Sequence, residues 1–132
     1  MATHAKDGGI FLDDQRLKSF TAETGSGVVN WQKILDRLNT LDREVTLSVE
    51  DHGGTFEIPI FNPAFISKFP DLTTLELSKL LHLANQTKNL AEAGKLAPVD
   101  RNDWQNICER RVKNGIKNMK SIIRNWDKSR IK

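Results

Sequence analysis

Residues 47–54, "LSVEDHGG", decide the fold that we expect for this chain. They continue an apolar, β-branched run, residues 45–49, which is typical of a strand buried on both faces. Glu50, Asp51 and His52 follow this run directly, and two glycines come after them. The sequence therefore predicts a strand whose carboxyl end carries charged side chains that could ligate a metal.

A second stretch near the start of the chain, residues 3–9, "THAKDGG", repeats this pattern. Residues 1–7 are expected to form a short strand, and His4, Lys6 and Asp7 lie at its end. Because side chains alternate along a strand, His4 and Lys6 share one face. Two strand ends of this chain therefore carry similar groups.

A helix is expected between the two strands, at residues 31–41, with Asn30 as its N-cap. Its apolar residues recur at helical spacing: Trp31, Ile34, Leu35, Leu38 and Leu41. A strand–helix–strand unit implies parallel strands and a right-handed crossover. Residues 8–30 are expected to be a loop, with a turn or two of helix in "DDQRLKSF", residues 13–20.

The segment that follows, residues 51–72, is expected to be a long, ordered loop. Its part "TFEIPIF" alternates like a strand, but Pro59 argues against a central strand. The part "NPAFISKF" predicts a short helix. Covering a substrate, contacting a second chain, and simple packing of the later helices all stay open as roles for this loop.

Two more helices are expected after this loop. Thr73 and Glu76 form a capping box that opens the first, and Gly94 is a natural end for it. The second follows Pro98 and carries an apolar stripe over more than twenty residues. The members of that stripe are Trp104, Ile107, Cys108, Val112, Ile116, Met119, Ile122, Ile123 and Trp126.

The ends of adjacent parallel strands lie at the same edge of a sheet, where α/β folds place their active sites. We therefore expect the two polar clusters to be neighbours. An imidazole and a carboxylate together can bind Mn²⁺, Mg²⁺, Co²⁺ or Zn²⁺. From spacing alone the plainer interpretation stays open: Asp51 and His52 are ordinary loop residues, and Glu50 is an ion-pair partner.

Three motifs in this order resemble the last two strands of the xylose isomerase-like TIM-barrel superfamily of sugar phosphate isomerases and epimerases. They are His4-Ala5-Lys6-Asp7, then Gly25-Ser26-Gly27 leading to Trp31, then Ser48-Val49-Glu50. The resemblance covers about residues 2–54. It implies an α/β fold, a partial TIM (β/α)₈ barrel in which a C-terminal βαβ unit precedes a long loop and two helices. Residues 1–54 would be the barrel part, and residues 55–132 a loop and helical extension of the same domain.

The resemblance also implies a chemistry. His4 and Glu50 would be two of four ligands to a divalent metal in an isomerase or epimerase of a sugar or sugar phosphate. Glu50 and Lys6 would be catalytic, in proton transfer beside a carbonyl through an enediol-type intermediate. Lys6, Asp7 and His52 would bind the substrate.

A TIM barrel needs about 250 residues, whereas this chain has 132. The other ligands of the family come from earlier strands, so the metal site is expected to be incomplete and the chain inactive alone. A truncated gene product, a split subunit and a non-catalytic remnant or accessory subunit all stay open, and so does whether the chain is itself an enzyme. The expected partner is the N-terminal part of the barrel or a second copy.

Composition limits the other classes of protein to which this chain could belong. The chain shows neither an apolar run of membrane-spanning length nor a signal peptide, and its single Cys108 fits a reducing compartment, so a cytoplasmic protein is expected. Residues 110–132 hold nine Lys or Arg and one acid, Asp127. A basic helical nucleic-acid-binding protein is therefore an alternative. We do not expect nucleic acid to be a partner, since no known binding motif is present.

Overall fold

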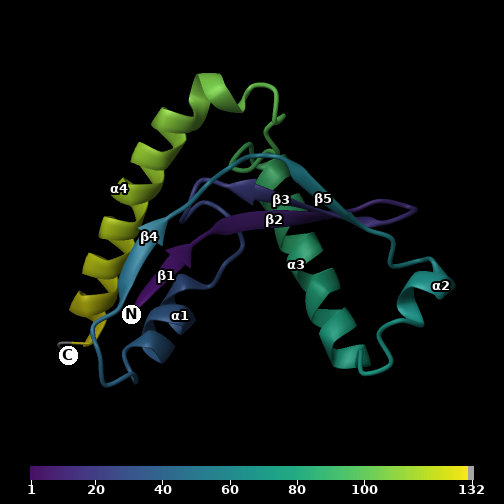
Figure 1. Ribbon diagram of the computed structural model, residues 1–132, viewed down its shortest axis with the longest axis horizontal. Helices are drawn as coiled ribbons and strands as arrows, with labels where there is room; N and C mark the ends of the chain where they lie inside the picture. Colours follow the sequence, from purple (N-terminus) through teal and green to yellow (C-terminus); the bar gives the residue numbers. More distant parts are fainter. Residues whose placement is uncertain (131–132) are drawn as a thin grey trace.

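The first strand, β1 (Ala2–Ala5), pairs in parallel with β4 (Thr46–Val49), which confirms the predicted parallel pair. The computed structural model describes residues 1–130 (Figure 1). His4 lies opposite Ser48 in the register of the two strands. Their carboxyl ends, and the residues that follow, therefore lie at the same edge.

Two helices, α1 (Trp31–Leu38) and α4 (Trp104–Arg130), pack on each other, and α4 lies along β4 (Figure 1). The predicted N-cap of α1 is confirmed, because the Asn30 side chain accepts a hydrogen bond from the backbone of Lys33. The core between helices and strands comprises Ala5, Trp31 and Met119, packed by Val29, Leu47, Val49, Ile122 and Ile123. The predicted apolar stripe of the last helix thus supplies part of the core.

The glycine of α4, Gly115, sets how closely this helix approaches the strand. A Cβ atom at this position would lie 3.0 Å from a methyl group of Val49 and 3.4 Å from Thr24. A side chain at this position would require Val49 or the helix to shift by a few tenths of an ångström, so glycine permits the close approach of α4 to β4.

The opposite face of this two-stranded sheet is exposed at Ala2, His4, Thr46 and Ser48. The prediction that residues 45–49 are buried on both faces is therefore wrong for the described chain. One face of the strand packs on α4, whereas the side chains of the other face meet solvent. β-branched residues are also favoured in strands that are buried on one face alone, so their presence does not by itself indicate burial on both faces.

A second sheet joins β2 (Asp7–Leu12), β3 (Leu17–Ala22) and β5 (Thr55–Ile58) in an antiparallel order with β3 in the middle. The prediction of a loop over residues 8–30, with helical turns in residues 13–20, is wrong over this hairpin. Alternation is visible at Phe20 and Ala22, which share one face and pack with Leu96, whereas the buried Leu17 lies on the other face; Phe20 also stacks on Phe11. The Asp13 carboxylate accepts from the backbone of the following residues and closes the turn.

The long segment after β4 is ordered, as expected. The structure confirms its β-like part as β5, at the edge of the sheet and just before Pro59, and its short helix as α2 (Pro63–Ile66). The capping box that opens α3 (Thr74–Glu92) is confirmed, and this helix ends just before Gly94, whose φ is +68°. The Thr87 hydroxyl of α3 accepts from the backbone of Ile10, which fastens the helix to β2.

Within residues 1–130 the fold is thus mixed α/β, with two small sheets and no closed barrel. The boundary expected at residue 54 does not separate the sheets, because β5 pairs with β3. None of the helices in this part of the chain is long and apolar enough to cross a membrane.

Candidate functional site

Three of the predicted site residues meet at the carboxyl ends of β1 and β4. His4 Nδ1 lies 2.5 Å from one carboxylate oxygen of Glu50, and Lys6 Nζ lies 2.8 Å from the other. The Glu50 backbone donates to the Ala5 carbonyl, which continues the ladder and fixes the Glu50 backbone beside β1. All three side chains remain accessible: 64% of His4, 44% of Lys6 and 36% of Glu50 is exposed.

The surrounding charges keep Glu50 ionised. The hydrogen bond from Lys6 is the largest influence that lowers the pKa of Glu50 below its ordinary value of 4.5, and the charges of Lys6, His4 and His52 act in the same direction. Partial desolvation opposes them. At neutral pH Glu50 is therefore a carboxylate, the form that a metal ligand or a general base requires.

The next residue, Asp51, points away from this cluster into the protein. It forms a buried ion pair with Arg111 of α4, with the two guanidinium nitrogens Nε and NH2 at 2.8 and 2.7 Å from one oxygen, and only 1% of the Asp51 side chain is exposed. The same guanidinium donates to the Thr21 carbonyl and lies over the Trp104 ring, 5.6 Å from its centroid. One arginine thus joins α4, β3 and the residue adjacent to Glu50.

Asp7 is also buried, and four N–H groups surround its carboxylate. The backbones of Gly8, Gly25 and Val29 donate to it, and so does the indole of Trp31 at 3.0 Å. A carboxylate has about four acceptor positions, so these donors occupy them. Asp7 holds together the end of β1, the loop before α1 and α1 itself; its assignment to substrate binding stays a prediction.

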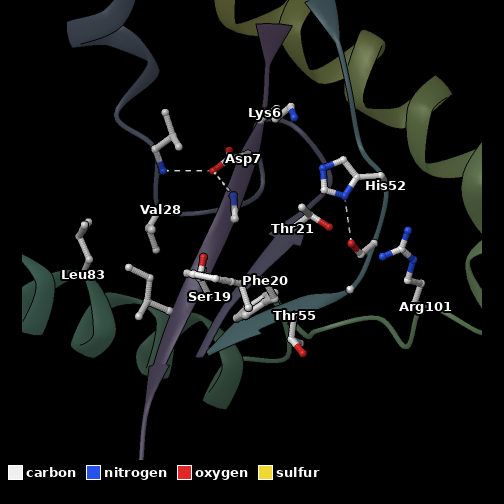
Figure 2. A pocket seen from close by; sticks show the side chains of 17 residues that line it. Lys6, Asp7, Ser19, Phe20, Thr21, Val28, His52, Thr55, Leu83 and Arg101 are labelled. Carbon is white, nitrogen blue, oxygen red and sulfur yellow. Dashed lines mark hydrogen bonds between the residues drawn. The ribbon is translucent and has the colours of Figure 1, made fainter. Parts of the chain in front are cut away.

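A cavity of about 550 Å³ adjoins the cluster (Figure 2). Its lining includes the predicted substrate-binding residues Lys6, Asp7 and His52. The sheet of β2, β3 and β5 contributes Ser19, Phe20, Thr21 and Thr55, and the remaining wall includes Val28, Leu83 and Arg101. The size is in the range of cavities that hold small ligands.

The donor chemistry at the strand ends fits part of a metal site. An imidazole nitrogen and a carboxylate are ligands for Mn²⁺, Co²⁺ and Zn²⁺, and the Nδ1 and Oε2 atoms of His4 and Glu50 are already adjacent. Residues 1–130 contain no group of three or more His, Cys, Asp or Glu side chains that could hold an ion. This chain therefore supplies two metal-competent side chains at this point, with Lys6 as a neighbouring cation.

Sequence reasoning missed Arg101, Arg111 and Thr21. Arg111 lies in the basic run of the last helix, and its place in the apolar stripe, four residues before Gly115, is the signal that distinguishes it from the exposed cations. Arg101 precedes α4 in a turn, and Thr21 lies in the hairpin that was expected to be a loop. Neither position carries a local pattern that marks a site.

No family model, curated protein or solved structure matches this chain, so its interpretation rests on its own sequence and structure.

Proposed function

We propose that this chain is the C-terminal βαβ part of a divalent-metal-dependent isomerase or epimerase acting on a sugar or sugar phosphate, with a partial (β/α)₈ barrel as its fold. One observation carries the proposal: His4, Lys6 and Glu50 meet at the carboxyl ends of two parallel strands. This is where α/β barrels place their catalytic residues.

In this proposal each residue has a role that follows from its chemistry. His4 and Glu50 would hold the metal, whose contribution when bound would be polarisation of a carbonyl and a hydroxyl of the substrate. Glu50 is a carboxylate at neutral pH, the protonation state that can accept the proton next to that carbonyl. Lys6, held within 2.8 Å of Glu50, is a donor for a substrate oxygen that gains negative charge.

The remaining ligands and strands come, in this proposal, from the N-terminal part of a barrel or from a second copy. The exposed face of β1 and β4 supports this. Its side chains Ala2, His4, Thr46 and Ser48 are small or polar, as the inward-facing positions of a barrel near its active site can be. Within residues 1–130 the sheet contains only β1 and β4, so the outer edges of these two strands are available for pairing with further strands.

A non-catalytic accessory subunit is the nearest alternative, and metal binding separates it from the proposal. We propose no nucleic-acid role. The cations Arg110, Lys117, Lys120, Arg124 and Lys128 are exposed on the side of α4 away from its packed residues, as expected for the solvated face of an outer helix.

Metal binding can be measured by calorimetric titration of Mn²⁺ into the full chain. We expect weak binding, because two ligands are few, and its loss in His4→Gln and in Glu50→Gln. Two matched controls should bind as the wild type does. His82→Gln removes an exposed imidazole on α3. Glu57→Gln removes a second carboxylate paired with two cations, Arg16 and Lys18.

Equal binding by the site variants and their controls would overturn the assignment of His4 and Glu50. Absence of Mn²⁺, Co²⁺ and Zn²⁺ binding, both in the chain alone and in its complex with any partner, would favour the accessory subunit instead.

A further inference from the structure

The charges that line the cavity are unbalanced. Its lining contains two cations, Lys6 and Arg101, against a single carboxylate, Asp7. The Asp7 carboxylate is occupied by its four N–H donors. The groups left to meet a ligand are therefore donors, which favours a ligand with negative charge.

Arg101 is the most available of these donors. Within residues 1–130 its guanidinium makes no hydrogen bond and no ion pair, whereas Lys6 is engaged by Glu50. The turn that carries Arg101 is fixed, because Asp103 donates to the Asp100 carbonyl and Asn102 to the Asp100 side chain. A planar guanidinium with several donors suits the oxygens of a phosphate or a carboxylate.

His52 lies on the same side of the cavity as Arg101 (Figure 2). The backbone brings them together through Gly53 and Gly54, which both have positive φ, at +63° and +85°. A Cβ on Gly53 would lie 3.2 Å from the Trp104 ring, so glycine lets this segment approach the start of α4. His52 Nδ1 is 3.1 Å from the Gly53 carbonyl, so the ring is held against its own backbone beside Arg101.

The rest of the cavity suits a short polyhydroxy chain. Its lining includes the polar residues Ser19 and Thr55, and Val28 and Leu83 provide apolar contact (Figure 2). Thr21 Oγ1 is buried and has no hydrogen-bond partner within residues 1–130. A buried hydroxyl without a partner is costly, but this atom is shielded from solvent, so the groups that a ligand in the cavity can reach are those of the other lining residues.

We propose that this cavity binds a small polyhydroxy ligand through an anionic group, a phosphate or a carboxylate, held by Arg101 on the side of the cavity where His52 lies. The sugar-like nature of the ligand rests on the proposed function, whereas the anion site follows from the cavity alone. Arg101 lies outside the segment that resembles the barrel family. It is thus a specificity-determining residue that the resemblance does not assign.

A matched series of three-carbon ligands tests this: glycerol 3-phosphate, glycerate and glycerol. Binding to the full chain is followed by NMR chemical shifts with a metal chelator present, so that metal binding plays no part. We expect at least one anion to bind and to shift the His52 and Thr21 signals, with glycerol about tenfold weaker or undetected. Which anion binds more tightly identifies the group as phosphate or carboxylate.

Arg101→Gln should weaken binding of the preferred anion about tenfold. Arg110→Gln is the control, because Arg110 is equally exposed but lies on α4 outside the cavity. Glycerol binding as tightly as the anions, equal effects of Arg101→Gln and Arg110→Gln, or no anion binding up to about 10 mM would each overturn the proposal. Loss of anion binding with Mn²⁺ binding retained would overturn this inference alone and leave the proposed function standing.

Discussion

At the scale of single residues, two carboxylates of this chain have opposite surroundings. Asp7 is buried among four N–H groups, whereas Glu50 is accessible and faces His4 and Lys6. The first arrangement stabilises the fold, because buried donors and acceptors satisfy one another. The second leaves reactive groups open to a ligand, so these two strand-end carboxylates serve different purposes.

Replacing Asp7 tests the structural arrangement. Asp7→Ala leaves four N–H groups without their acceptor, so we expect the free energy of unfolding to fall by about 3 kcal/mol. Urea unfolding followed by tryptophan fluorescence measures this change. Asp14→Ala, at an exposed position of the turn after β2, is the control and should change stability by less than about 0.5 kcal/mol. Similar stability of the two variants would contradict the structural role of Asp7, in which its carboxylate accepts from all four N–H groups.

Replacing Lys6 tests the electrostatics of the cluster. In Lys6→Met the Glu50 carboxylate loses its main stabilising donor, so its pKa should rise toward 4.5. In the wild type the folded-state pKa is lowered, so the contribution to stability is present above pH 4.5 and is lost as the pH falls through the lowered value. NMR titration of the Glu50 carboxyl carbon measures the shift. Lys18→Met, beside Glu57 on the other sheet, should leave the Glu50 titration unchanged.

At the scale of elements, the last helix does more than cover the sheet. Arg111 of this helix forms an ion pair with the Asp51 carboxylate, which is 60 residues away in the sequence. Asp51 is the residue directly after Glu50. The backbone of Gly53 also donates to Asp51, at 3.3 Å. The loop that leaves β4 is therefore fastened to α4, and the position of Glu50 depends on a helix that follows it by more than fifty residues.

A double-mutant cycle measures this connection. Asp51→Leu alone leaves a buried, unpaired guanidinium and should lower the free energy of unfolding by about 3–5 kcal/mol. Combining it with Arg111→Met replaces the pair by apolar groups and should recover most of that loss. Urea unfolding gives the four free energies; if the double variant is destabilised by the sum of both single effects, the two side chains do not act as a pair.

At the scale of the whole molecule, one sheet remains half covered. Helices α1 and α4 pack on one side of β1 and β4, and the other side is exposed; in the described part of the chain, residues 1–130, no further strand pairs with the outer edges. Two strands bury little surface, so parallel sheets normally have more strands and cover on both faces. This molecule therefore has a surface that fits further strands.

Sedimentation of the chain tests this expectation. We expect species heavier than a monomer of 15.0 kDa, with a proportion that rises with concentration. Thr46→Lys places a charge on the exposed face of β4 and should shift the distribution toward the monomer. Ser121→Lys, at an exposed position of α4, should not. A folded monomer at all concentrations would refute the need for outside strands.

The sequence by itself determined the parts of this protein that depend on neighbouring residues. Helical spacing predicted α1, α3 and α4, the Thr73–Glu76 capping box placed the start of α3, and the strand–helix–strand order predicted the parallel pair. Strand alternation and parallel pairing also sufficed to bring His4, Lys6 and Glu50 together, since each lies at or just beyond the end of a predicted strand.

Only the tertiary structure decided the second sheet, the cavity and the roles of Asp7, Asp51 and Arg111. The pairing of β3 with β5 joins segments more than thirty residues apart, and the Asp51–Arg111 pair spans 60. Such contacts leave no periodic pattern in either segment. A buried aspartate and an exposed one look alike in the sequence, because burial is decided by the elements that pack around the side chain, and that packing exists only once the chain has folded.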